Sequence, residues 1–227
     1  MNANKALTRR NVLAGTAGSA CLALVGCSHR AHGHKPRIQY DNAFFYDAEG
    51  KFKPDAAKDA YIALMDYHGY PVFPQMRDEI WVSDYGAGRF AEVGVGALFF
   101  VNNTEHRYMM LDIYLLPNQM LPEHYHVATA ENPAKLEGWV TRHGLSYVYG
   151  AGEPTPNIKA VIPKCHLNGT ATVMHETILG PGQYVGLKQA EERHWQFGGR
   201  EGAIVTEVAT VHDGAGIRHT DEKLVFG

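Results

Sequence analysis

From about residue 90 onward, the sequence consists of short β-prone runs that are separated by corners rich in Gly, Pro, Asn and Asp. Runs of this kind, each bounded by turn residues, are typical of strands. Many short strands joined by such corners predict an all-β domain, a sandwich or barrel of the jelly-roll type. We expect strands over residues 93–102, 108–116, 138–149, 161–165, 171–179, 183–187, 194–197 and 203–211, with a further strand around His124.

A helical extension is predicted ahead of the strands, at about residues 54–84. Asp55 is expected to cap a helix over residues 56–68, and Gly69 is expected to end it. Residues 71–84 predict a second, less regular segment with a short helix before Trp81. The first helix carries a stripe that should pack against the barrel, formed by Ala57, Ala60, Tyr61, Leu64 and His68.

The amino end has the pattern of an export signal. Arg9 and Arg10 precede an apolar run of small residues, which ends in the segment Leu24-Val25-Gly26-Cys27. The arginine pair resembles a twin-arginine signal, and the last four residues resemble a lipobox with Cys27 as the lipidated residue. We therefore expect a signal over 1–26, a polar tether over 27–39 and one domain over 40–227. The mature chain would be a periplasmic or cell-surface lipoprotein that touches the membrane only through this anchor.

Charge and cysteine content exclude two further possibilities. The formal net charge is −3, which argues against nucleic-acid binding. Of three cysteines, Cys21 belongs to the signal and Cys27 to the lipobox. Cys165 then remains alone in the mature chain, so no internal disulfide is expected.

The pattern His124-Tyr125-His126 predicts a metal site. Side chains two residues apart on a strand share a face, so both imidazoles can point at one cation. The segment Glu131-Asn132-Pro133 is a turn signal, and a hairpin return would carry Glu137 beside the histidines. His194, which follows the corner at 180–182, offers a third imidazole. Such a set of nitrogen and oxygen ligands suits a divalent transition metal.

The histidines could have no metal-binding role, and a different carboxylate could complete the site. The chain has 13 histidines, and most histidines in a protein are ordinary surface or packed residues. Glu131 competes with Glu137 for the carboxylate position. We prefer Glu137, because it begins an extended run with Trp139 on the same face, whereas Glu131 lies in a turn where a carboxylate is usually solvated.

At the level of motifs, the chain resembles the cupins. Residues 120–126, Met-Leu-Pro-Glu-His-Tyr-His, resemble the first cupin motif, and Gly180-Pro181-Gly182 through His194 resembles the second. Within the cupins, the chain is most similar to the D-lyxose isomerase-like sugar isomerases. Residues 206–218 resemble that family's carboxyl-terminal signature, which has a Glu-Val-Ser segment followed by acidic residues and an arginine. The resemblance covers about residues 112–221.

This resemblance implies an aldose–ketose isomerase that acts on a pentose or hexose through an enediol. It implies that His124, His126, Glu137 and His194 hold a divalent metal, for which we expect Mn, with Fe, Co, Ni and Zn left open. Glu207 would carry the proton between C1 and C2, and Arg218 would stabilise negative charge. A homodimer is also expected. The residues expected to bind the sugar are Lys135, Trp139, Trp195, His212 and Asp213.

Some features leave other readings open. Glu207 could instead pair with a structural arginine, and Trp195 could belong to the core because it alternates away from His194. Ala209 replaces the serine of the family pattern, and His212 stands where an asparagine is usual. These departures put the sugar preference in doubt. The competing functions are an exported cupin oxygenase or a uronate or polysaccharide lyase, and a non-catalytic module that binds sugar or metal.

Overall fold

The structure is a computed structural model, and it describes residues 37–225. The predicted export signal, Cys27 and most of the predicted tether lie outside these residues. Residues 37–225 belong to a single compact unit. Within them, no helix is both long enough and apolar enough to cross a membrane.

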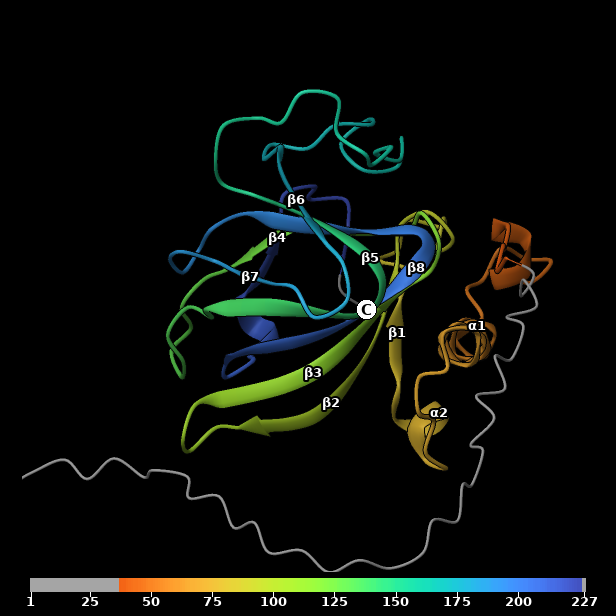
Figure 1. The fold of residues 1–227 in the computed structure, drawn as a ribbon, viewed down its shortest axis with the longest axis horizontal. Coiled ribbons are helices and arrows are strands. Elements are labelled where there is room, and N and C mark those ends of the chain that lie inside the picture. The colour runs from red at the N-terminus through yellow and green to blue at the C-terminus, as the bar shows by residue number, and fades with distance from the viewer. Residues whose placement is uncertain (1–36, 226–227) are drawn as a thin grey trace, which may run out of the picture. The chain divides into compact units, whose positions relative to one another are not determined.

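The described chain begins with helices and continues as strands (Figure 1). A 3-10 turn, η1 (Asn42–Phe45), is followed by α1 (Pro54–His68) and α2 (Met76–Glu79). A second 3-10 turn, η2 (Gly214–Gly216), lies between the last two strands. The strands are β1 (Trp81–Ser83), β2 (Val95–Asn103), β3 (Tyr108–Leu115), β4 (Met120–His126), β5 (Glu137–Gly150), β6 (His175–Leu179), β7 (Tyr184–Gly186), β8 (His194–Thr210) and β9 (Ile217–His219).

The strands form one curled, nine-stranded sheet, and strand β8 lies at its centre (Figure 1). Its 17 residues pair antiparallel with β3, β4 and β5. The sequence predicted two strands here, but 194–210 is continuous, because Gly198 and Gly202 let β8 bend closely past a neighbouring backbone. A Cβ atom on Gly198 would lie 2.5 Å from the carbonyl oxygen of Leu116, and Gly202 has φ 73°. The predicted all-β class with an N-terminal helical extension is confirmed.

Helix α1 covers part of the outer face of the sheet, as predicted. Tyr61 and Leu64 on α1 pack with Tyr114 of β3 and Ile204 of β8 in a fully buried cluster. Tyr61 also donates a hydrogen bond of 2.7 Å to Gln119, which ties the helix to the corner before β4. Gly69 ends the helix with φ 68°, as predicted.

Three local predictions were wrong. Asp55 does not cap α1: the N-cap is Lys53 without a side-chain cap, and Pro54 occupies the first turn with its fixed φ. Residues 161–163 have no regular structure and 164–165 lie in a turn, so the predicted strand is absent from this part of the chain. Strands β4 and β5 do not form a hairpin, because each of them pairs with β8 instead of with the other.

Candidate metal centre and active site

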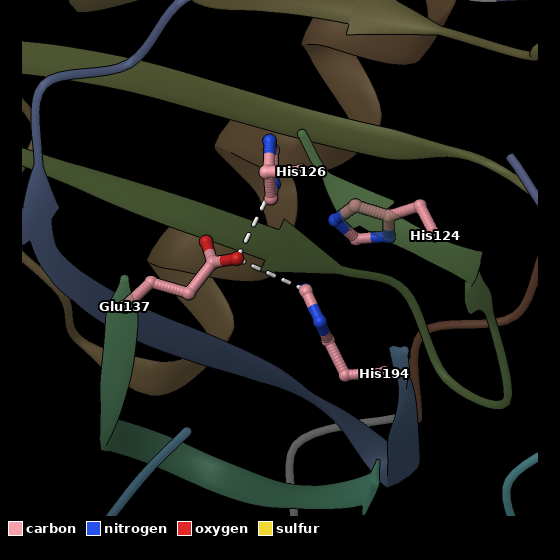
Figure 2. Close-up of side chains that lie close together, drawn as sticks. All are labelled: His124, His126, Glu137 and His194. Carbon is pink, nitrogen blue, oxygen red and sulfur yellow. Dashed lines mark ion pairs between the residues drawn. The ribbon is translucent and has the colours of Figure 1, made fainter. Parts of the chain in front are cut away.

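Four predicted ligands meet inside the curled sheet (Figure 2). His124 and His126 lie on β4, Glu137 begins β5 and His194 begins β8, and all four are buried. One candidate ligand atom from each lies within 4.8 Å of the others. The pairing of β4 with β8 sets His124 opposite His194, so tertiary pairing rather than a hairpin completes the cluster.

The carboxylate is Glu137. Its Oε1 atom lies 3.2 Å from Nε2 of His126 and 3.2 Å from Nε2 of His194. Glu131 is instead exposed on the turn, where its backbone N–H donates to Thr129. Glu137 is therefore the carboxylate that the structure places with the histidines.

Backbone carbonyl groups fix the orientation of two of the imidazoles. Nδ1 of His124 donates to the carbonyl of Pro122 at 2.8 Å, and Nδ1 of His194 donates to the carbonyl of Glu192 at 2.9 Å. A carbonyl can only accept, so Nδ1 carries the proton and the lone pair remains on Nε2. Such a contact on the remote nitrogen is usual for histidines that bind a metal.

The buried polar atoms of this cluster fit a cation. Nε2 of His126, Nε2 of His194 and Oε1 of Glu137 are buried, and none of them has a hydrogen-bond partner within residues 37–225. Leaving such an atom unpaired costs about 1–3 kcal/mol, so the cluster is expected to hold a bound group. Three imidazoles and one carboxylate are a suitable donor set for a divalent transition metal.

The charge states agree with this fit. Burial lowers the pKa of His124 and that of His126, which keeps both imidazoles neutral and able to donate a lone pair. Burial alone would raise the pKa of Glu137, but the charges of Lys135 and His194 outweigh it and hold this pKa well below its usual value. The pKa of His194 is lowered by burial and raised more by Glu137. A proton on His194 therefore competes with a cation for the same place.

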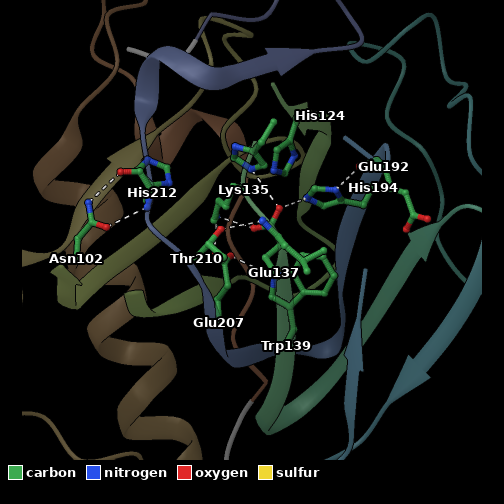
Figure 3. A network of polar contacts seen from close by, with 12 residues as sticks. Asn102, His124, Lys135, Glu137, Trp139, Glu192, His194, Glu207, Thr210 and His212 are labelled. Atoms are coloured by element: carbon green, nitrogen blue, oxygen red, sulfur yellow. Dashed lines mark hydrogen bonds and ion pairs between the residues drawn. The ribbon is translucent and has the colours of Figure 1, made fainter. Parts of the chain in front are cut away.

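A second buried group adjoins the cluster: Lys135, Glu207 and Trp139 (Figure 3). Nζ of Lys135 lies 2.6 Å from Oε2 of Glu137 and 2.5 Å from Oε1 of Glu207. Nε1 of Trp139 donates to Oε2 of Glu207 at 3.1 Å. Burial raises the pKa of Glu207 to about 7, although Lys135 opposes the shift. This carboxyl group can therefore exchange a proton near neutral pH.

A narrow cavity of about 50 Å³ links the two groups. Its polar lining comes from His124, His126, Lys135, Glu207, His212 and His219. The remaining lining is aliphatic or aromatic and comes from Trp81, Tyr85, Val95, Ala97, Leu111, Ile113, Leu121 and Ile217. A larger cavity of about 490 Å³ lies against Tyr70, Arg142 and His143, but among the described residues it adjoins no cluster of potential metal ligands. We therefore place the candidate active site in the narrow cavity.

Four of the expected active-site residues lie elsewhere or act differently. Arg218 is exposed and donates to the carbonyl groups of Ala215 and Ile217, because strand alternation in β9 turns it away from the cavity. Asp213 accepts from Thr129, Asn132 and the backbone N–H of Ala215, so it shapes the turn at η2. Trp139 holds Glu207 rather than lining the cavity. Trp195 belongs to the core.

Trp195 shows this core role plainly. It is fully buried, its ring stacks on Tyr149 at 3.6 Å between centroids, and its Nε1 donates to the carbonyl of Val173. We expect Trp195→Ala to lower the free energy of unfolding by about 3–5 kcal/mol, the usual cost of truncating a buried aromatic side chain. Urea unfolding followed by circular dichroism measures this loss. An unchanged stability together with a raised KM for sugar would contradict the core assignment.

Lys135 and His212, which were also expected to bind the sugar, both line the cavity. Trp81, Tyr85 and His219 also line the cavity, although the sequence did not indicate them as site residues. The sequence feature that could have indicated His219 is its place directly after Arg218, because neighbouring side chains on a strand point to opposite faces. It could be read only once β9 was known to be a strand, and three residues are too few to show alternation in a sequence.

Comparison with known proteins gives the family. No family model matches the chain. The D-lyxose ketol-isomerase of Cohnella laeviribosi is 31% identical over 154 residues, 68% of this chain and 82% of the relative. The D-lyxose ketol-isomerase of Thermofilum sp. is 32% identical over 170 residues, 75% of this chain and 88% of the relative. The D-lyxose/D-mannose isomerase of Thermosediminibacter oceani is 33% identical, with 75% and 87% covered.

Solved structures agree on the fold. The L-ribose isomerase of Cellulomonas parahominis with L-psicose superposes with a TM-score of 0.55 at 15% identity, covering 79% of this chain and 95% of that one. The L-ribose isomerase of Acinetobacter sp. DL28 with L-ribose gives a TM-score of 0.54 at 15% identity, with 74% and 82% covered. The predicted cupin fold is thereby confirmed. The chain belongs to the D-lyxose isomerase family and is a sugar isomerase of the aldose–ketose class.

Proposed function

We propose that this enzyme is a metal-dependent isomerase that interconverts an aldose of five or six carbons and its ketose. The observation that supports the proposal best is the buried cluster of four ligands with a second buried carboxylate, Glu207, beside it. The names of the relatives point to D-lyxose and D-mannose as the first sugars to test.

A divalent cation, when bound, would polarise the carbonyl group of the open-chain sugar and orient its neighbouring hydroxyl. His124, His126, Glu137 and His194 would hold it. Mn²⁺ is our first choice of metal, and the donor set also accommodates Fe, Co, Ni or Zn.

Glu207 is the proposed proton carrier. Its carboxylate would take the proton from C2 of the aldose, and the electron pair of that C–H bond would form the enediol. The same carboxyl group would then return the proton to C1, while a hydroxyl proton passes from O2 to O1, which gives the ketose. The reaction needs no oxidant or reductant, and a pKa of about 7 suits both halves of the transfer.

Lys135 and Trp139 would set the state of Glu207. The charge of Lys135 favours the ionised form that accepts the proton, and it also faces the negative charge that develops on the enediolate. Trp139 Nε1 holds the second carboxylate oxygen, so that Glu207 keeps one orientation.

The pH profile tests the role of Lys135. Glu207 must be ionised to accept the proton, so kcat/KM should rise with pH through a pKa near 7. Lys135 lowers the pKa of Glu207, so Lys135→Met should move this acidic limb to higher pH. Lys159→Met, at an exposed position, is the matched control and should leave the profile in place. An unmoved limb in Lys135→Met would contradict the assignment.

Proton NMR in D₂O tests the proposed reaction. The metal-loaded protein is incubated with D-lyxose, D-mannose, their ketoses and a wider panel of aldoses. Conversion with deuterium entering at C1 of the ketose or C2 of the aldose is the expected result, because the shuttle exchanges its proton with solvent. Conversion without any deuterium would contradict a carrier that exchanges its proton with solvent and would favour hydride transfer. Failure to convert any sugar would remove the proposal.

Location and assembly remain proposals as well. We propose export and lipid anchoring through Cys27, which lies outside the described residues, and a homodimeric state. Mass spectrometry of the mature amino terminus should find an acylated Cys27, and an unprocessed Met1 would contradict export. Light scattering of the purified domain should give twice the mass of one chain.

A further inference from the structure

Two histidines outside the metal cluster, His212 and His219, face the same cavity. Both ring nitrogens of His219 and Nδ1 of His212 are buried without a hydrogen-bond partner among the described residues. An unpaired buried nitrogen costs about 1–3 kcal/mol, and a histidine that served packing alone would avoid that cost as a Phe or Leu. The part of the cavity lined by His212 and His219 is therefore expected to contact a polar group of a bound molecule.

The position of His219 is fixed by the strand that carries it. Strand β9 pairs with β4 so that His219 lies opposite His124, and the two ring centroids are 6.1 Å apart. On its other side, His219 packs edge-to-face on Tyr85 at 5.1 Å. The imidazole is therefore held at the cavity wall, beside the proposed metal and not in its ligand set.

His219 and the proton-transfer group lie beside different members of the metal cluster. Lys135 and Glu207 contact Glu137 and Trp139, whereas His219 contacts His124 and Tyr85. A chain that places its reacting carbons at Glu207 and spans the narrow cavity would bring a later part of its length to His219. An imidazole offers one donor and one acceptor, which matches a hydroxyl group. The apolar neighbours Trp81, Leu121 and Ile217 line the cavity without offering a comparable acceptor.

We propose that His219 binds a sugar hydroxyl remote from C1 and C2, and that this contact helps to determine which aldoses the enzyme accepts. The inference rests on the proposed isomerase function. It assigns His219 to substrate specificity, since the residue is not one of the four clustered ligands.

The test combines variants of His219 with deoxy sugars. His219→Phe keeps an aromatic ring at this position but removes both nitrogens. His219→Gln instead offers a hydrogen-bond donor and an acceptor without the ring. The kcat/KM of each is measured with the preferred aldose and with analogues that lack one hydroxyl at C3, C4 or C5. We expect the kcat/KM of His219→Phe with the parent aldose to be about 10- to 100-fold below that of the wild type. With the one deoxy analogue that lacks the contacted hydroxyl, the kcat/KM of the variant should equal that of the wild type. His219→Gln should recover part of the loss, and metal content should stay unchanged.

His106→Phe, on the exposed turn between β2 and β3, is the matched control and should match the wild type with every sugar. An equal loss of His219→Phe with all sugars, or no loss with any, would overturn the inference while the isomerase function stood. If the wild type converts no sugar, the proposed function fails first. NMR titration with arabinitol then decides: weaker binding to His219→Phe supports the hydroxyl contact, and unchanged binding overturns it.

Discussion

Glu207→Gln is expected to bind the metal as the wild type does and to lose kcat by about 10³-fold. The amide keeps the size of the carboxyl group but only one of its two accepted hydrogen bonds, because its oxygen alone can accept from Lys135 or Trp139. It cannot accept a proton from C2, and general acid–base catalysis of this kind contributes about 10²–10⁴-fold. Because Glu207 is not one of the four clustered ligands, metal content should not fall. Metal analysis and a discontinuous assay of ketose formation on the same sample measure both quantities.

The fold of this variant should hold. Burial raises the pKa of Glu207 from 4.5 to about 7 in the folded state, so its ionised form costs stability as pH rises through that range. A neutral Gln removes this cost but gives up one accepted hydrogen bond, so the Tm at pH 8 should stay close to that of the wild type. Glu105→Gln, at an exposed turn, is the control. Full turnover in Glu207→Gln would show that another group moves the proton.

His126→Ala is expected to lose both metal and turnover. Removal of a direct ligand should weaken metal binding by more than the 10- to 100-fold that loss of an outer partner typically costs. It also leaves Oε1 of Glu137 without one of its two imidazole neighbours, 3.2 Å away. Metal content by mass spectrometry should fall from one ion per chain towards zero, and isomerisation should fall to background.

The control for this variant is His175→Ala, at an exposed position on β6. Added imidazole should restore part of the metal binding in His126→Ala, because the small ring can occupy the space left by the side chain. A His126→Ala protein that keeps one ion per chain and wild-type turnover would contradict the proposed ligand set.

Local rules predicted part of the four-residue cluster that the structure brings together. Alternation along β4 places His124 and His126 on one face, and a turn composition separates the exposed Glu131 from the buried Glu137. The same alternation raised the alternative that Trp195 faces away from His194, and the structure shows that it does. Local periodicity was sufficient for these residues.

The predictions that were wrong concern features set by contacts between distant parts of the chain. The hairpin prediction was wrong because β8, some 70 residues downstream of β4, pairs with both β4 and β5. Arg218 was misplaced because a three-residue strand shows no periodicity, so its exposed face could not be recognised. Lys135 was named for sugar binding, but its ion pairs to Glu137 and Glu207 appear only when the sheet has closed.

Anomalous X-ray diffraction from crystals of the metal-loaded enzyme, recorded at the absorption edge of the metal, would locate the cation that the four clustered residues are proposed to hold. We expect one peak per chain, within bonding distance of Nε2 of His124, His126 and His194 and of a carboxylate oxygen of Glu137. A metal peak beside other residues, or no peak between β4, β5 and β8 in crystals of enzyme that is active in solution, would contradict the proposed metal site.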